Sequence, residues 1–250
     1  MNEDTERIKA FFLDNKINVF GIAQASSLET EPSGYRPSDV LAGAKSILCV
    51  GIPFPKGIFQ CAGRAEHMYW RAAAVYYRHI DAILTRAAGL IEEQGEIAGP
   101  VYGCFPYDLA GWGDFWGYMS LVKAGEAVGI GKLGKNGLLF NAKYGPRLLL
   151  GGIVTTASLT PFSFPEKDDK GCPATCSVCQ EQCPVRAIDE TGRVNRIACV
   201  KHSMKSPIFS HFMKTLAPPP QELQMINHVT GVDDHSWYTC IKCVSTCSRL

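Results

Sequence analysis

Residues 176–184 read CSVCQEQCP, and residues 240–247 repeat the same cysteine spacing as CIKCVSTC. Bacterial iron–sulfur proteins hold clusters with C-x2-C-x2-C-x3-C-P runs, and where there are two clusters the fourth cysteine of each run ligates the other cluster. Cys172 precedes the first run and Cys199 lies between the two, so eight of the eleven cysteines fall in the last third of the chain. Two sets of four thiolates predict two [4Fe-4S] clusters, and therefore a protein that handles electrons.

The crossover rule divides these cysteines between the two clusters. The first set is expected to be Cys172, Cys176, Cys179 and Cys247, and the second set Cys183, Cys199, Cys240 and Cys243. The loop between Cys172 and Cys176 is one residue longer than the usual spacing, and no proline follows Cys247. Both differences are departures from the pattern, and the first makes Cys172 the ligand that fits it least.

Two other uses of clustered cysteines remain open. Zinc sites pair C-x2-C knuckles, often with histidine, and the x2–x3 triplets fit that pattern poorly. A disulfide framework needs an oxidising compartment. Residues 1–7 (MNEDTER) are polar and acidic and do not resemble a secretory signal. Cys49, Cys61 and Cys104 lie apart from the runs, and small buried hydrophobes are the simplest interpretation of them.

Composition excludes several classes of protein. The chain has 250 residues, 46% of them hydrophobic, and a formal net charge of +1. This charge gives no strong field toward nucleic acid or an anionic membrane. No apolar stretch approaches the roughly 20 residues needed to span a bilayer. We therefore expect a cytoplasmic protein with no membrane partner.

Periodicity predicts a mixed α+β fold in two parts. The pattern predicts helices at residues 3–15, 38–44 and 65–94 and strands at residues 17–23, 46–53 and 148–155. Residues 160–169 contain two prolines and are expected to form a linker. The predicted domains are therefore an α/β domain at residues 1–165 and a two-cluster, ferredoxin-like module at residues 166–250.

Two glycine-rich stretches suggest a pocket. Residues 99–118 are rich in glycine and aromatic residues and cannot form one regular element, so they are expected to form either a pocket wall or an irregular covering loop. Residues 129–136 (GIGKLGKN) match G-x-G-x-x-G, but this stretch follows a helical pattern and precedes a strand-like one. A dinucleotide site needs the opposite order. The loop is better suited to wrap another large cofactor.

The same loop, with its flanks, resembles a known family. Residues 127–139 (AVGIGKLGKNGLL) and 144–155 (YGPRLLLGGIVT) are similar to the core of the epoxyqueuosine reductases, which carry a GLGWIGKN run followed by a GSWFFLGE run. Residues 19–23, 41–46 and 183–188 also match, and the similarity extends from about residue 10 to the C-terminus. The reductive dehalogenases are more distant relatives.

The resemblance implies a nitroreductase-like domain with a ferredoxin-like module packed on it, and a base-off cobalamin between them. The positions that match the family's cofactor loop are Gly129, Gly131, Gly134, Lys135, Asn136, Tyr144 and Gly145. The protein supplies positioning and protection for such a cofactor, while the cofactor does the difficult chemistry.

Departures from the family predict a different substrate. This chain stops at the second cysteine run, without the helical repeats that help these reductases hold tRNA. Lys132 and Arg147 stand where the family's runs have tryptophan. The family's proton-donating aspartate aligns near Phe115, with Asp114 beside it. These differences led to the expectation that tRNA is not a partner.

The leading hypothesis is a corrinoid-dependent reductase that draws electrons from an external low-potential donor. Its small-molecule substrate is expected in a pocket lined by residues 102–118, with the candidate proton donors Asp114, Asp108 and Tyr107. One alternative is an electron-transfer protein that reduces a corrinoid partner and has no catalysis of its own. Another is a flavin-dependent reductase on the same type of fold.

Overall fold

The structure is a computed structural model that describes residues 2–104, 107–109, 115–165, 171–205, 237–238 and 240–247, with the backbone alone at 107–109, 115–116, 204–205 and 237–238. Its elements, in chain order, are α1 (Glu3–Asp14), β1 (Phe20–Gln24), the 3-10 helix η1 (Ala25–Leu28), α2 (Pro37–Val40), β2 (Ser46–Pro53), α3 (Lys56–Gln60), α4 (Ala65–Glu92), β3 (Ala98–Val101), β4 (Tyr107–Leu109), β5 (Phe115–Gly117), α5 (Leu121–Ala127), β6 (Lys132–Leu133), β7 (Leu139–Phe140), β8 (Leu148–Thr155), β9 (Phe162–Phe164), α6 (Val178–Glu181), α7 (Arg196–Ser203), β10 (Met204–Lys205), β11 (Trp237–Tyr238) and α10 (Lys242–Ser245).

A five-stranded sheet organises the first part of the chain. Its strand order is β3-β8-β2-β1-β9, and every pairing in it is antiparallel. β2 and β8 pair along their whole lengths, from Ser46 opposite Thr155 to Pro53 opposite Leu148. A mixed α and β fold is thus confirmed, with helices that connect antiparallel strands.

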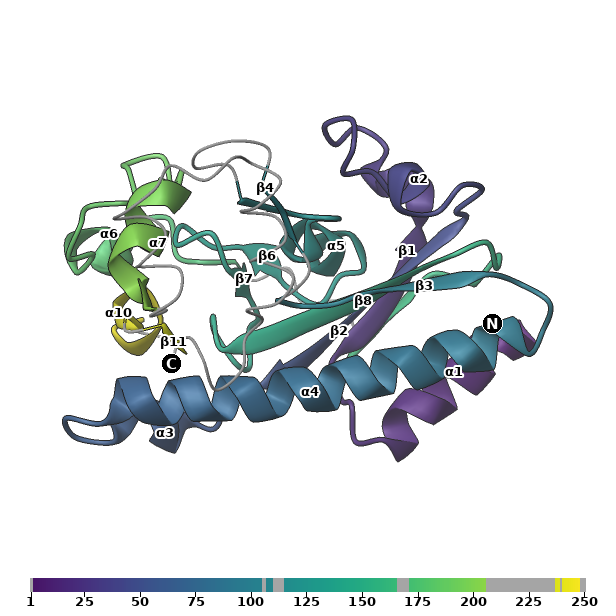
Figure 1. The fold of residues 1–250 in the computed structure, drawn as a ribbon, viewed down its shortest axis with the longest axis horizontal. Helices are drawn as coiled ribbons and strands as arrows, with labels where there is room; N and C mark the ends of the chain where they lie inside the picture. The colour runs from purple at the N-terminus through teal and green to yellow at the C-terminus, as the bar shows by residue number, and fades with distance from the viewer. Residues whose placement is uncertain are drawn as a thin grey trace, which may run out of the picture.

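The sheet is buried on both faces because its strands are apolar at successive positions. In β2, Leu48 and Val50 join the core on the side of α1 and α4, while Ile47 and Cys49 join the core on the side of α5. This is the alternation of side chains that strand geometry requires. Figure 1 shows α1 and α4 along one face of the sheet and α5 on the other, so the region has three layers.

Glycine in β8 allows α4 to approach the sheet closely. A Cβ atom added at Gly151 would lie 2.6 Å from Cδ1 of Leu84, which is fully buried. Leu84 and Ile80 therefore pack directly on the strand backbone.

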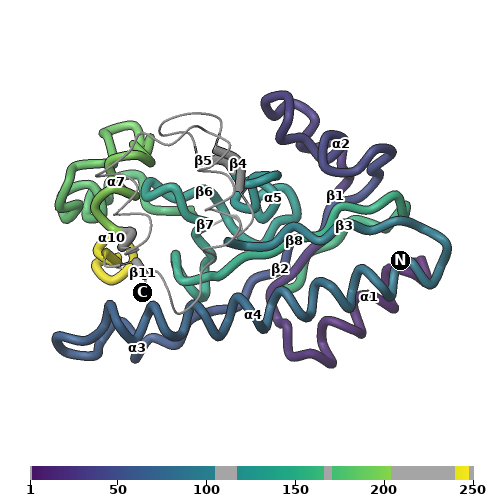
Figure 2. The backbone as a smooth tube through the Cα atoms, in the orientation of Figure 1, coloured from purple at the N-terminus to yellow at the C-terminus, as the bar shows by residue number. Residues whose placement is uncertain are grey.

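Helix α4 links the sheet to the cysteine-rich part of the chain. It is 28 residues long. It runs beneath the sheet and continues past the sheet's end to lie under the segment that carries the cysteines (Figures 1 and 2). Tyr69, near the start of α4, lies near Cys243: burial raises the pKa of the tyrosine, and the charge of Cys243 raises it further.

The cysteine-rich segment comprises residues 171–205 and 240–247. Its short helices α6 and α10 contact each other, which brings the two cysteine runs together. Buried apolar side chains are few in this segment: Ala187, Ile188, Ile241 and Val244. The ferredoxin-like topology of this segment stays a prediction.

Most predicted elements are present, whereas several short ones, among them α3, β3 and β9, were not predicted. β2 and β8 have the predicted bounds, and α4 ends two residues before the predicted end. The stretch expected to be a linker contains β9, which pairs with β1 at the edge of the sheet. The division at residues 165 and 166 is not tested by this arrangement and stays a prediction. In the described part of the chain, no helix is long and apolar enough to cross a membrane.

Candidate functional site

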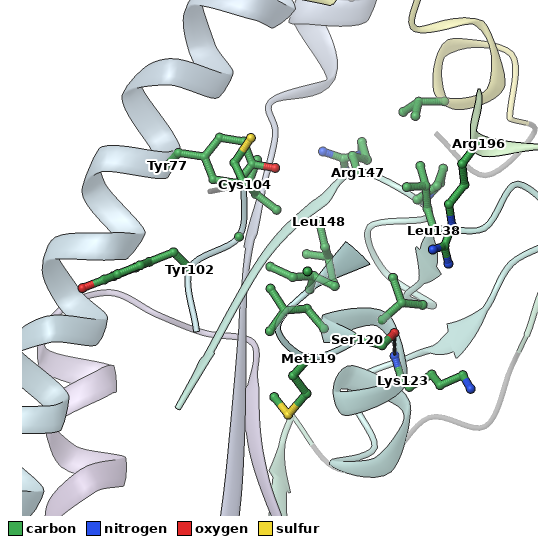
Figure 3. A pocket seen from close by; sticks show the side chains of 18 of the residues that line it. Tyr77, Tyr102, Cys104, Met119, Ser120, Lys123, Leu138, Arg147, Leu148 and Arg196 are labelled. Atoms are coloured by element: carbon green, nitrogen blue, oxygen red, sulfur yellow. Dashed lines mark hydrogen bonds between the residues drawn. The ribbon is translucent and has the colours of Figure 1, made fainter. Parts of the chain in front are cut away.

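A cavity of about 500 Å³ lies between the sheet, α4 and the cysteine-rich segment. One wall is aromatic and comes from the first part of the chain: Phe54, Phe59, Tyr69, Tyr77 and Tyr102. The opposite wall includes Arg196, Val200 and Val244 from the cysteine-rich segment. Lys123 and Arg196 are exposed, so the cavity reaches the surface where they lie. Figure 3 shows Tyr77 and Cys104 on one side, Lys123 and Arg196 on the other, and Arg147 between them.

The cysteines of the first predicted set lie near one another. The pKa of the Cys179 thiol is raised by burial first, and then by the charges of Cys172, Cys176 and Cys247. These three are the partners that the crossover rule gives to Cys179. The structure therefore brings together residues that are up to 75 positions apart, including the atypically spaced Cys172.

The second predicted set is grouped in the same way. Burial raises the pKa of Cys199, and the charges of Cys240 and Cys183 raise it further, while a hydrogen bond from Ser203 lowers it. Burial raises the pKa of Cys243 to about 12, with further contributions from neighbours in both sets. One of these neighbours is Cys179, so the two sets lie next to each other.

The chemistry of this donor set suits iron–sulfur clusters. All eleven cysteines are free thiols in the structure. In the part of the chain that the structure describes, no group of three or more His, Cys, Asp or Glu side chains is gathered as it would be around one metal ion. Four thiolates side by side repel each other unless iron offsets their charge. The ligand assignment itself stays a prediction.

The glycine loop contacts the cysteine runs. Nζ of Lys135 donates hydrogen bonds to the carbonyl oxygens of Ala174 at 2.5 Å and Cys176 at 2.7 Å. Nδ2 of Asn136 donates to the carbonyl oxygen of Cys243 at 3.3 Å. One loop thus holds both cysteine runs against the sheet domain.

The residues predicted to bind a cofactor lie close to the cavity in sequence but do not line it. None of Gly129, Gly131, Gly134, Lys135, Asn136, Tyr144 and Gly145 is among its lining residues, whereas the neighbouring Leu138, Pro146 and Arg147 are. A Cβ at Gly131 would lie 2.6 Å from the carbonyl oxygen of Phe140, so that glycine is needed where β6 and β7 pack. A cofactor role for the seven residues stays a prediction.

The predicted proton donors cannot be placed at the cavity. Asp108 and Tyr107 lie in β4, where only the backbone is described, and Asp114 lies outside the described residues. Cys104 and Gly117, on either side of this segment, do line the cavity.

Sequence reasoning missed a half-buried acid near the cavity wall. Burial raises the pKa of Asp81, on α4, to about 6. Its Oδ1 atom is buried and has no hydrogen-bond partner among the described residues. Asp81 lies beside Cys104, whose pKa is raised by burial and then by the charge of Asp81. Spacing gives no signal for this pair, because 23 positions separate its members.

Sequence comparison finds epoxyqueuosine reductases. The chain is 26% identical over 211 residues to the epoxyqueuosine reductase of Lactococcus garvieae, a match that covers 76% of this chain and 56% of the relative. The chain thus spans little more than half the length of this curated relative. No protein-family model matches the chain.

Structure comparison finds the same enzymes. The fold matches an epoxyqueuosine reductase solved with an epoxyqueuosine-modified tRNA-Tyr stem loop, with a TM-score of 0.63, 17% identity, and coverage of 98% of this chain and 64% of the other. It also matches a reductive dehalogenase whose structure suggested a mechanism for B12-dependent dehalogenation, with a TM-score of 0.55, 17% identity, and coverage of 79% and 29%.

The tRNA-bound structure corrects one prediction. The expectation of no tRNA partner was wrong as a statement about this group of proteins, because a reductase of the same fold has been solved with a modified tRNA stem loop. The departures at Lys132 and Arg147 do not outweigh this finding. The predicted resemblance itself is confirmed: the chain is similar in sequence to epoxyqueuosine reductases, and its fold matches theirs and that of the reductive dehalogenases.

Proposed function

We propose that this protein is an iron–sulfur reductase. Two [4Fe-4S] clusters, held by the two cysteine sets, carry electrons from an external low-potential donor to a corrinoid that binds in the cavity. One observation carries this proposal: Val200 and Val244, which line the cavity, directly follow Cys199 and Cys243 of the second set. The proposed electron source thus lies at the cavity wall.

The positions of the two sets give the order of electron transfer. The second set lies next to the cavity, since Tyr69 lines the cavity and also lies beside Cys243. The first set lies behind the second, and Cys179 of the first set is near enough to Cys243 of the second for its charge to raise the pKa of Cys243. Electrons therefore enter at the first cluster and reach the cavity through the second.

The cavity walls suit a corrinoid in their chemistry. The aromatic and aliphatic side chains exclude water and offer flat contact surface to a planar macrocycle. A whole corrinoid is larger than about 500 Å³, so part of it must extend through the opening beside Lys123 and Arg196. A reduced corrinoid supplies a strongly reducing, nucleophilic cobalt centre. Cys104 lines the cavity, and burial followed by the charge of Asp81 raises the pKa of its thiol, so the thiol is neutral.

The substrate class has two candidates. The first candidate substrate is a tRNA stem loop that carries epoxyqueuosine, because a protein of the same fold has been solved with one. A small molecule that fits the cavity is the second.

Anaerobic purification with cofactor analysis tests the proposal. We expect about eight irons per chain, a broad iron–sulfur absorption, and corrin bands that stay with the protein after cobalamin is added at micromolar concentration. When a reduced electron donor is then added, the protein should convert one of the two candidate substrates. Protein with full iron that binds no cobalamin would leave an electron carrier, and bound flavin absorption would indicate the flavin reductase.

A further inference from the structure

Arg147 is a buried cation in the cavity wall. Arg147 is 7% exposed and lines the cavity. In the chain it directly precedes β8. One terminal nitrogen donates to the carbonyl oxygen of Phe54, and the backbone amide of Phe54 donates to the carbonyl oxygen of Arg147 at 2.9 Å. The guanidinium carbon lies 5.7 Å from the ring centroid of Tyr144. These contacts fix the orientation of the guanidinium group.

The charge of Arg147 has no carboxylate partner among the residues that the structure describes. Its Nε atom is buried and donates to no acceptor there. Burial lowers the pKa of the guanidinium group, and the nearby Tyr144 opposes this effect. A buried charge without a counter-ion destabilises a folded protein. Its retention in a cavity wall is explained when a ligand supplies the missing negative charge.

The other cations of the cavity differ from Arg147. Lys123 is exposed, and its Nζ lies 2.6 and 2.7 Å from the two carboxylate oxygens of Glu31, so its charge is already offset. Arg196 is exposed to solvent. Arg147 is thus the buried cation of the cavity, within the described residues, and it stands where the relatives' run has tryptophan.

We propose that Arg147 forms an anion subsite, which receives a carboxylate or phosphate group of the ligand that occupies the cavity. The planar guanidinium group suits both anions, because its N–H groups donate in parallel to two oxygens. Two ligands could supply the anion: the substrate, or the phosphate in the nucleotide tail of the corrinoid.

Inorganic phosphate tests the subsite without any corrinoid. Holding ionic strength constant with chloride, we expect phosphate to raise the melting temperature of the cluster-loaded protein. In Arg147→Gln, the apparent Kd for phosphate should rise about tenfold or more, because a charge-assisted contact is lost. Arg7→Gln is the matched control, since Arg7 on α1 pairs with Glu93 at the end of α4, outside the cavity lining, and its loss changes the net charge equally. Equal phosphate responses in wild type and Arg147→Gln would overturn the proposal.

A second measurement needs no variant. Phenylglyoxal modifies arginine, and mass spectrometry can follow the peptide that contains Arg147 in the wild-type protein. Phosphate should protect this residue with a saturable dependence that matches its Kd. Modification of Arg147 at the same rate with and without phosphate would contradict the subsite even if Arg147→Gln fails to fold.

A comparison of two corrinoids identifies the source of the anion, and only this experiment rests on the proposed function. Cobinamide lacks the nucleotide tail and its phosphate, whereas cobalamin has both. Weaker binding of cobalamin but not cobinamide by Arg147→Gln would assign the subsite to the tail. Phosphate binding that persists with cobalamin bound would assign it to the substrate. If the protein binds neither corrinoid, the proposed function is wrong, but the phosphate measurements still test the anion subsite at Arg147.

Discussion

The sheet region and the cysteine-rich segment are stabilised in different ways. In the sheet region, side chains such as Leu48 and Ile153 in one core and Ile47 and Val154 in the other have no exposed surface. The cysteine-rich segment buries few apolar side chains, and all its cysteines keep some exposure. Small domains with little core rely on metals or disulfides. The sheet region can therefore fold by apolar burial alone, whereas the cysteine-rich segment needs its predicted clusters.

The largest effect is expected from Cys179→Ala. Loss of one predicted ligand should remove one cluster, so iron should fall from about eight to about four per chain. The sheet region should keep its thermal transition, because no core residue changes. Iron analysis and circular dichroism on anaerobic protein measure both effects.

Cys61→Ala is the control for this change. Cys61 lies at the end of α3, and its thiol bonds only the carbonyl oxygen of Gly57 among the described residues. Iron should remain at its wild-type value in this variant. Full iron in Cys179→Ala would show that the predicted ligand assignment is wrong.

The converse change is Leu84→Ala, in the sheet region. Leu84 is fully buried against the glycine of β8, so its truncation leaves a cavity. Unfolding free energy should fall by about 2–5 kcal/mol. Iron per chain should stay constant in the folded protein. Urea titration followed by tryptophan fluorescence gives the free energy, and coupled loss of iron in folded protein would argue against two independent modes of stabilisation.

Lys135→Ala tests the contact between the two regions. The change removes two hydrogen bonds to backbone carbonyls of the first cysteine run. Charged donors contribute about 1.5–3 kcal/mol per hydrogen bond at most, so release of iron to a chelator should become severalfold faster. The exposed Lys45 supplies a matched control, as Lys45→Ala should leave the release rate unchanged.

The smallest effect is expected from Asp81→Asn. The pKa of Asp81 is raised to about 6 in the folded protein, so the stability it contributes is complete below about pH 4 and is lost as pH rises through about 6. The asparagine side chain of the variant does not ionise, so the variant does not lose this stability as the pH rises. Because Asp81 is only half-buried, the variant should be more stable by about 1 kcal/mol at pH 8. Thermal melts at pH 4 and pH 8 check this, and an equal difference at both values would refute it.

Sequence patterns predicted those parts of the molecule that depend on local spacing. The apolar runs of β2 and β8 gave correct bounds because a strand buried on both faces has few polar positions. β9 was missed because its flanking Pro161 and Pro165 indicate a linker. A short edge strand tolerates such prolines at its ends.

The candidate site was predicted only in part. The crossover spacing groups cysteines that the structure also brings near one another, because the pattern reflects three-dimensional neighbours, and the ligand assignment itself stays a prediction. The cavity was expected within residues 102–118, yet most of its wall comes from other segments, including α4 and the start of β8. Asp81 and Arg147 acquire their properties from burial by distant segments, which no local pattern records.

The uninterrupted helix α4 has a consequence for electron tunnelling, whose rate falls exponentially with distance. Tyr69 near one end of this helix lies beside Cys243, and Leu84 near the other end is anchored in the sheet core. Under the proposed function, this single rigid rod helps to set the gap between the predicted clusters and the cavity. A kink introduced midway along this rod, away from the predicted cysteine ligands, should change the rate of the proposed transfer without removing any of those ligands.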